Sequence, residues 1–433
     1  MFESIFSYFW VSFGFGLLSL LNPCVFPLIP FTVSAFTPKE GAPKKNYLLE
    51  SVIYSLGIIF TFSILGIFFS LFFGASGITK LATNPFLNFS IGIIFLFFAY
   101  ALIGFDFLLP SSLVLFYSKL ENVSGSGYLS ILIKGFIISI ATFTCTMPFV
   151  GSILVTASKG EWFFPLIGMF GYGLAFSIPF TLLSLFPMIL ERLPKNGKWN
   201  AKFRGILGIF EIIASLKFFS NADLIWGFNI LSREIFLGIT IILLVINTLY
   251  TLDLFEDMKN FYNQIKKISK YQISLSIIFV SLIIYLSFGI TGSNLGELEA
   301  YLPPKQNNDS DKSTDLVWME DLDIAKSKAI ETGKPILINF TGVICTNCRY
   351  MEENVLNTQE VKKELSKYIL VELFTDRGTE KDDANQEFEE KKFGTNGIPY
   401  YAILDKNDKI LSAHLGITRD TEEFINFLNL RKN

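Results

Sequence analysis

Two cysteines in the last quarter of the chain, Cys345 and Cys348, have the spacing of a redox-active dithiol. They follow the apolar run 335–340, which is typical of a short buried strand, so the Cys-x-x-Cys sequence is expected at the start of a helix. Backbone N–H groups and the helix dipole favour a thiolate at that position. Such surroundings lower a cysteine pKa from ~8.5 to between ~3.5 and ~7.5. Cys345 is therefore predicted to be the nucleophile, with Cys348 in reach to resolve a mixed disulfide.

The same spacing also occurs in half of a zinc site. The sequence after residue 315 has no second cysteine pair, and its single histidine, His414, is expected to be structural. We therefore interpret Cys345 and Cys348 as redox-active and predict no metal. The sequence contains no flavin, haem or nicotinamide motif, so no cofactor is predicted.

The other two cysteines, Cys24 and Cys145, each begin a Cys-x-x-Pro sequence inside a strongly apolar stretch. A lone cysteine in an apolar helix is usually a packing residue, but here the context occurs twice, with Pro27 and Pro148. Proline at membrane depth needs neighbours or a water-lined cavity, and a thiolate needs the same polar setting. If three helices make one unit, the two occurrences form an inverted repeat, as in carriers that expose a site to alternate sides.

Hydrophobic residues make up 51% of the chain, and charged residues are dense only after Tyr301. A helix needs ~20 apolar residues to span a bilayer. The sixth candidate span is the weakest because Glu211 and Lys217 interrupt it. The sequence predicts a polytopic α-helical membrane domain with eight spans, at 6–31, 50–73, 86–109, 129–156, 163–190, 204–220, 234–252 and 272–290.

Basic residues between the predicted helices gather in alternate loops. Most belong to the odd-numbered loops, for example Lys44, Lys198 and Lys266. Since basic loops stay on the cytoplasmic side of a membrane, an even number of spans puts both termini on the other side. The Cys-x-x-Cys region is then expected outside the cytoplasm. The net charge of −3 gives no reason to expect a nucleic-acid partner.

Three parts follow from this organisation: residues 1–292 as the membrane domain, 293–314 as a linker and 315–433 as an α/β domain. The linker is predicted because residues 303–313 are polar, led by two prolines and without periodicity. In the last domain we expect helices at 319–332, 359–366 and 421–430, strands at 336–340, 368–374, 400–404 and 409–415, and a charged excursion at 376–392.

This order of helix, strand, Cys-x-x-Cys helix, strand, Ile-Pro, hairpin and helix resembles the thioredoxin fold. The residues that carry the resemblance are Cys345, Cys348, Ile398 and Pro399. The resemblance implies a cis peptide bond before Pro399, which then faces the disulfide. It also implies that the backbone of Ile398 offers hydrogen bonds to bound partners.

Two positions depart from that family's pattern. Ile344 precedes the first cysteine, where tryptophan is usual. Asn339 stands six residues before Cys345, where many thioredoxins bury an aspartate that accepts a proton, and an amide cannot titrate. Glu352, four residues after Cys348, is one helical turn from the resolving thiol and is a candidate for that part. The alternative is that Glu352 is an exposed helix residue without a role in the chemistry.

The whole chain is similar to the DsbD/CcdA family of thiol–disulfide transporters. The stretch 22–30, with Pro23 and Pro27 on either side of its cysteine, is similar to the family signature, and 144–148 matches its second cysteine. Eight spans followed by a thioredoxin-like domain resemble DsbD, a protein-disulfide reductase, more than the shorter CcdA. The extra N-terminal domain usual in DsbD is not in this sequence, so the last carrier is expected to be a separate protein or the terminal domain itself.

The resemblance implies a relay. A reduced cytoplasmic thioredoxin attacks a Cys24–Cys145 disulfide, and the reduced pair then attacks the Cys345–Cys348 disulfide on the outer side. The terminal domain passes the electrons to extracytoplasmic partners, either thioredoxin-like proteins or disulfide-bonded proteins such as apocytochromes c. The implied location is a bacterial inner membrane. Two alternatives remain: a membrane-tethered thioredoxin-like oxidoreductase whose helices are only an anchor, and a solute or metal transporter with a redox sensor.

Overall fold

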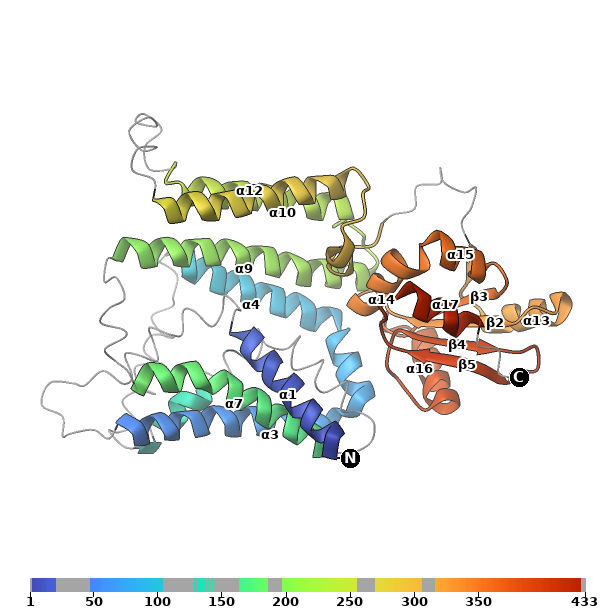
Figure 1. Cartoon of the computed structure of the whole chain (residues 1–433), viewed down its shortest axis with the longest axis horizontal. Helices are drawn as coiled ribbons and strands as arrows, with labels where there is room; N and C mark the ends of the chain where they lie inside the picture. The colour runs from blue at the N-terminus through green and yellow to red at the C-terminus, as the bar shows by residue number, and fades with distance from the viewer. Residues whose placement is uncertain are drawn as a thin grey trace, which may run out of the picture. The chain divides into compact units, whose positions relative to one another are not determined.

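A computed structural model gives the helices, the sheet and the core of this chain (Figure 1). The chain divides into two compact units, Met1–Ile78 with Ile93–Ala214 and Thr79–Gly92 with Ser215–Asn433. The residues that the structure describes are 2–20, 47–103, 128–129, 131–137, 139, 142, 163–185, 197–254, 269–305 and 316–429. The helices before the α/β domain are α1 (Phe2–Ser19), α3 (Tyr47–Ala82), α4 (Pro85–Ile103), α7 (Phe163–Leu185), α9 (Gly197–Trp226), α10 (Arg233–Thr251) and α12 (Lys270–Ile290).

Apolar helices long enough to cross a membrane occur where five of the spans were predicted. Within the described residues they are Leu49–Phe68, Pro85–Ile103, Lys202–Trp226, Arg233–Thr251 and Lys270–Ile290. The first and fifth predicted spans contain shorter apolar helices, Phe6–Ser19 and Leu166–Pro179. Most of the fourth, 129–156, lies outside the described part of the chain. The chain is therefore a multi-pass membrane protein, and the count of eight spans stays a prediction.

Small residues bring the helices of the first unit close together. At Gly16 of α1, an added Cβ would lie 2.6 Å from the carbonyl oxygen of Tyr172 in α7. At Gly57 of α3, an added Cβ would lie 3.5 Å from the Cα of Gly135. The ring of Phe62 packs edge-on against Tyr172, with the ring centroids 5.2 Å apart. Close backbone approach of this kind favours association between membrane helices, where burial of apolar surface alone gives little gain.

In the second unit, α10 and α12 lie side by side and run in opposite directions (Figure 1). Gln272 near the start of α12 donates a hydrogen bond to the carbonyl oxygen of Thr251 at the end of α10, at 3.0 Å. At the start of α10, Arg233 forms a buried, two-pronged ion pair with Glu299 of the 3₁₀ helix η3 (Gly296–Tyr301). Each member of such a pair needs the other because either charge alone would be uncompensated.

Part of the predicted linker is folded. Residues 293–305 are described and contain η3, which contacts the α/β domain. There the Asn354 side chain donates to the carbonyl oxygen of Gly296 at 3.1 Å. Residues 306–314 lie outside the described part, and the predicted domain limits themselves stay predictions.

The α/β domain is built on a five-stranded mixed sheet with the order β1-β3-β2-β4-β5 (Figure 1). Strands β1, β3 and β2 run parallel, and β4 and β5 complete the sheet in antiparallel fashion. In this register Asn339 of β2 stands between Glu372 of β3 and Tyr401 of β4. The strands are β1 (Trp318–Met319), β2 (Ile336–Thr341), β3 (Ile369–Phe374), β4 (Tyr400–Leu404) and β5 (Ile410–Leu415).

Helices cover both faces of the sheet, because alternate residues of each strand point to opposite sides. Leu337 belongs to the core under α14, η4, α15 and α17, and its neighbour Ile338 belongs to the core on the face of α13 and α16. The domain thus has three layers of helix, sheet and helix. The helices are α13 (Leu322–Thr332), α14 (Thr346–Met351), the π-helical turn η4 (Glu352–Leu356), α15 (Gln359–Leu365), α16 (Glu380–Phe393) and α17 (Thr421–Asn429).

Two predictions for this domain are wrong, while the other predicted helices and strands occur within one or two residues of their expected ends. The region expected to be a charged excursion contains α16, which begins where the Thr379 hydroxyl accepts the N–H of Asp382. Its high charge hides it from a search for apolar periodicity. The first helix begins at Leu322 because Asp321 caps it, and the short strand β1 precedes it.

Candidate redox site

Cys345 and Cys348 form a disulfide where β2 passes into α14. Cys345 is the N-cap of α14, and its sulfur accepts the backbone N–H of Cys348 at 3.2 Å. Cys345 is partly exposed, whereas Cys348 is 1% exposed. A thiolate from outside can therefore reach Cys345, and Cys348 is the protected sulfur. This arrangement supports the roles predicted for the two cysteines.

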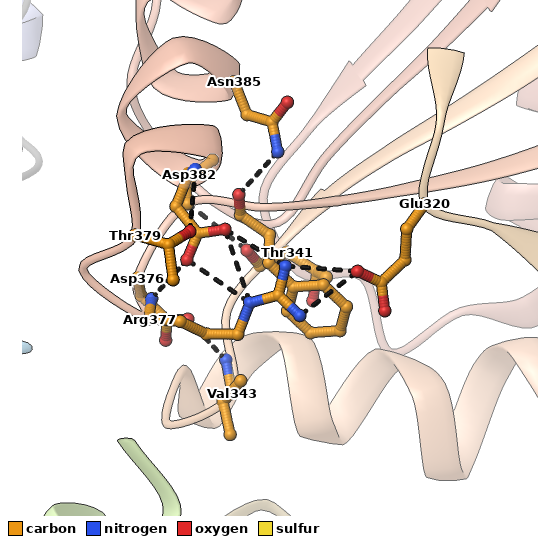
Figure 2. A network of polar contacts seen from close by, with 10 residues as sticks. Glu320, Thr341, Val343, Asp376, Arg377, Thr379, Asp382 and Asn385 are labelled. Atoms are coloured by element: carbon orange, nitrogen blue, oxygen red, sulfur yellow. Dashed lines mark hydrogen bonds and ion pairs between the residues drawn. The ribbon is translucent and has the colours of Figure 1, made fainter. Parts of the chain in front are cut away.

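A buried aspartate, Asp376, fixes the loop that leads to the disulfide. One carboxylate oxygen accepts the backbone N–H of Val343 at 2.8 Å (Figure 2), and the other accepts the N–H of Ile344 at 3.0 Å. Gly342 suits this loop because an added Cβ would clash with Asp376 Oδ2. Burial raises the pKa of Asp376, and the two N–H donors oppose the rise because they favour the carboxylate. Asp376 was not recognised in the sequence, where it lies far from the cysteines.

Arg377, the next residue, forms ion pairs that hold the segment containing Asp376 in place. Its guanidinium pairs with Asp382 of α16 at 3.1 Å and with Glu320 at 3.2 Å (Figure 2). The guanidinium carbon also lies 4.2 Å from the centroid of the Phe374 ring. Because this network joins the end of β3 to α16 and to the segment after β1, it restricts the position of the aspartate that fixes the loop.

The peptide bond between Ile398 and Pro399 is cis, and this prediction is confirmed. The Ile398 side chain reaches the same loop, since a Cβ on Gly342 would lie 2.9 Å from Ile398 Cδ1. Ile398 therefore lies next to the segment that enters the disulfide. That its backbone binds partners stays a prediction.

Glu352 lies under this loop and is only 18% exposed. Its carboxylate accepts the Thr341 hydroxyl at 3.1 Å and pairs with Arg349 at 2.8 Å. Its backbone N–H donates to the carbonyl of Cys348, one helical turn earlier. Burial raises the pKa of Glu352 to about 7, against the opposing effect of Arg349. A carboxyl group that titrates near neutral pH can exchange a proton with a thiol.

Three polar residues share the sheet face under α14. Asn339 is 1% exposed, Tyr401 is fully buried and Glu372 is partly buried. In the part of the chain that the structure describes, Asn339 Oδ1 and the Tyr401 hydroxyl have no hydrogen-bond partner. Of these three residues, only Asn339 was singled out from the sequence. A signal was present, because Glu372 is the single charged residue of an otherwise apolar strand, β3.

Cys24 and Cys145 lie outside the described residues, as do Pro23, Pro27 and Pro148. That these two cysteines come together therefore stays a prediction. Among the residues that are described, no group of three or more His, Cys, Asp or Glu side chains could bind a metal ion. The chemistry available at the described site is that of thiols and carboxyl groups.

Two known families match the chain, one over its first half and one over most of its α/β domain. Residues 5–222 match the cytochrome C biogenesis protein transmembrane domain, and residues 317–406 match a thioredoxin-like family. The thiol:disulfide interchange protein DsbD of Campylobacter jejuni strain RM1221 is 26% identical over 377 residues, which cover 85% of this chain and 62% of that protein. DsbD of Vibrio cholerae serotype O1 is 23% identical over 375 residues, covering 84% of this chain and 57% of that protein.

The chain thus spans less than two thirds of the length of these two relatives. Among solved structures, a DsbH oxidoreductase is similar at 19% sequence identity, with a TM-score of 0.23. That match covers 30% of this chain and 96% of the DsbH chain.

Proposed function

This chain belongs to the family of the cytochrome C biogenesis protein transmembrane domain, and on that premise we propose that it transfers reducing equivalents across a membrane by successive thiol–disulfide exchange. The observation that carries the proposal is the Cys345–Cys348 disulfide, with one accessible and one buried sulfur. It belongs to a chain whose other two cysteines both fall in the apolar first half. The proposed activity is that of a protein-disulfide reductase, and the similarity to thiol:disulfide interchange proteins supports it.

The exchange at the terminal pair begins with attack on Cys345. A thiolate of the membrane pair bonds to the Cys345 sulfur, the Cys345–Cys348 bond breaks, and Cys348 leaves as a thiolate that takes up a proton. The second membrane thiolate then attacks its partner's sulfur, so that a Cys24–Cys145 disulfide forms and Cys345 is released. Two electrons have moved from the membrane pair to the terminal pair. Each ~30 mV of favourable potential difference multiplies the equilibrium constant of such a transfer by ~10.

The reduced terminal pair then reduces a disulfide of an extracytoplasmic protein. The Cys345 thiolate attacks that disulfide and forms a mixed disulfide with the acceptor. Cys348 gives up its proton and attacks Cys345, which restores the Cys345–Cys348 bond and releases the reduced acceptor. Glu352 is the proposed acceptor of this proton, since it lies one turn from Cys348 and has a pKa of about 7.

The membrane domain supplies the electrons in this proposal. Cys24 and Cys145 form its reducible pair, and a reduced cytoplasmic thioredoxin is the donor. Pro23, Pro27 and Pro148 keep the helices open around the two sulfurs, because proline frees backbone groups that a polar cavity can satisfy. Two inverted three-helix units would expose the pair to each side in turn.

The proposed location is a bacterial inner membrane, with the terminal domain and both chain ends on the periplasmic side. The alternation of basic and non-basic loops supports this orientation. Residues 1–292 are the proposed electron-transfer domain, 293–314 the connection and 315–433 the periplasmic domain. Thioredoxin-like or disulfide-bonded proteins are the proposed acceptors. Use in cytochrome c maturation is proposed from the description of the matching family.

The redox state of the terminal pair in cells tests this function. Free thiols are alkylated in intact cells, and the peptide that contains Cys345 and Cys348 is analysed. We expect reduced peptide in the wild type and oxidised peptide in Cys24→Ala and in Cys145→Ala, because either change cuts the supply of electrons. Ser12→Ala, a buried change within α1 that removes no thiol, is expected to match the wild type. A reduced terminal pair in both cysteine variants would contradict the relay and favour a tethered oxidoreductase.

A further inference from the structure

A row of polar side chains crosses the sheet beneath the disulfide. Asn339 is in the middle, with Glu372 beside it on β3 and Tyr401 beside it on β4. Neighbouring strands are ~4.8 Å apart, so side chains in register on one face are in reach of each other. Thr341 lies on the same face, two residues after Asn339, and its hydroxyl donates to Glu352 of the covering helix. The two carboxyl groups therefore share one partly buried space.

These carboxyl groups influence each other electrostatically. Burial is the largest cause of the raised pKa of Glu352, and the negative charge of Glu372 raises it further. Burial also raises the pKa of Glu372 itself. Burial raises the pKa of Tyr401, and the negative charges of Glu352 and Glu372 raise it further. Both carboxylates therefore lie near the same buried phenol. Two like charges in such a space disfavour ionisation of both groups at once.

Asn339 cannot itself exchange a proton with the dithiol, so proton transfer depends on neighbouring residues. Its amide stands in the middle of the polar row and cannot accept or release a proton. Its Oδ1 is buried without a hydrogen-bond donor in the described part of the chain. The groups that can titrate are one step away, on the next strand and on the helix above.

We propose that Glu372 is a positioning residue for the dithiol reaction, and that its carboxylate sets the pH at which Glu352 takes the proton of Cys348. The inference rests on the proposed function, because it requires Cys348 to resolve mixed disulfides. In that step the Cys348 thiol passes its proton to the Glu352 carboxylate, and the resulting thiolate attacks the Cys345 sulfur. A Cys345–Cys348 bond forms, and the acceptor leaves as a thiolate with both electrons of the broken bond. Glu372 acts through charge alone.

Other charged groups also face the two carboxyl groups and must stay constant in a test. Arg349 lowers the pKa of both. Glu353 also acts on Glu352. Glu320 and Arg377 also act on Glu372. Since none of these is altered in the variants below, a change in pH dependence reports the charge at the strand position.

The test uses the purified full chain with Cys24 and Cys145 replaced by Ala, so that the terminal pair is the only dithiol. Reduced protein reacts with glutathione disulfide, and the rate at which Cys348 releases glutathione from Cys345 is measured by acid quench and mass spectrometry. We expect this rate to rise with pH, with a midpoint near the Glu352 pKa of about 7. In Glu372→Gln the midpoint should fall by about 0.5–1 pH unit, because loss of the negative neighbour lets Glu352 ionise at lower pH.

Further variants separate charge from structure. Glu372→Asp keeps the charge and should keep the midpoint, and so should Glu360→Gln, which removes an exposed charge from α15. If Glu372→Gln does not fold, Glu372→Met replaces it, because an apolar side chain of similar size can occupy a buried charged position. A midpoint in Glu372→Gln or Glu372→Met equal to that of Glu360→Gln would overturn the inference. No glutathione release from the parent protein at any pH would instead overturn the proposed function of the terminal pair.

Discussion

Asp376 and Gly342 show how single residues direct the chain into the dithiol helix. Each oxygen of Asp376 accepts one backbone N–H of the loop, and Gly342 leaves the space that the carboxylate needs. Cys345 is then left partly accessible while Cys348 is buried. The loop that leads to Cys345 is thus held by a residue outside the Cys-x-x-Cys motif.

Replacing Asp376 by Asn is expected to lower the free energy of unfolding of the α/β domain by about 1–3 kcal/mol, because one of two partly buried N–H groups loses its acceptor. Asp405→Asn is the matched control. There a single oxygen, Oδ1, accepts the N–H groups of Asn407 and Lys409, so an amide can retain both hydrogen bonds. Pulse proteolysis of the full chain across a urea gradient measures both variants, and equal losses would contradict the role given to Asp376.

The sequence predicts the parts of the site that are contiguous in it. The Cys-x-x-Cys pair and the cis bond at Ile398-Pro399 belong to short motifs, and both are present. Asp376 lies far from the cysteines in the sequence and carries no local signal. Glu372 stands out as the one charged residue of an apolar strand, but only the pairing of β2 with β3 brings it beside Asn339. Glu352 was recognised from its helical spacing, although its burial depends on the sheet.

At the scale of secondary structure, α16 is a helix that covers the sheet without an apolar stripe. Its buried residues Asp382, Gln386 and Glu389 are polar, and Phe388 and Phe393 pack against the core as partly buried residues. Glu389 is fully buried, and neither of its carboxyl oxygens has a hydrogen-bond partner among the residues that the structure describes. Burial raises the pKa of Glu389 to about 8. The acid is therefore neutral in the folded domain at pH 7.

Glu389 makes the stability of the domain depend on pH. Between its ordinary pKa of 4.5 and the folded value of about 8, the folded state keeps a proton that the unfolded state releases, so stability falls as pH rises. We expect Glu389→Gln to reduce this fall, measured as urea midpoints across that pH range. Glu387→Gln, on the exposed face of the same helix, is expected to follow the wild type. An unchanged fall in Glu389→Gln would contradict the assignment.

The helix η3 offers a second comparison at this scale, because it takes part in one buried and one exposed ion pair. Arg233→Ala leaves Glu299 buried without its partner and is expected to cost about 3–5 kcal/mol in unfolding free energy. Arg419→Ala breaks the pair with Glu297, whose side chains are 64% and 62% exposed, and should have a much smaller effect because solvent screens the two charges. Urea unfolding of both variants measures the difference. Similar costs would mean that the buried pair does not stabilise this end of α10.

The elements that could be predicted are those with a strong local pattern. The strands of the α/β domain are apolar runs between polar turns, and five apolar spans were found from hydropathy alone. The helix α16 was missed since its buried face is polar, and η3 was missed because its ion pair joins residues far apart in the sequence. Capping residues such as Thr379 and Asp321 were the available signals for the helix starts.

At the scale of the whole molecule, the chain joins a membrane domain to a thioredoxin-like domain. The family matches cover residues 5–222 and 317–406, which agrees with the change in composition near Tyr301. Such a joint is useful for electron transfer only if a membrane sulfur can meet Cys345. The repeated Cys-x-x-Pro sequence motivates the prediction that they meet. Whether the sulfurs come into contact cannot be read from the sequence, because it depends on how distant helices pack.

The most direct measurement is covalent trapping of the contact between the two dithiols. Cys348→Ala is combined with either Cys24→Ala or Cys145→Ala, so that one membrane sulfur remains to bond with Cys345 and no thiol can resolve the bond. A protease site is placed within residues 306–314, and the chain is cut after mild oxidation. We expect the two halves to stay joined until a reductant is added in at least one combination, and to separate when Cys345 is also replaced. Halves that separate without reductant in both combinations would contradict the relay.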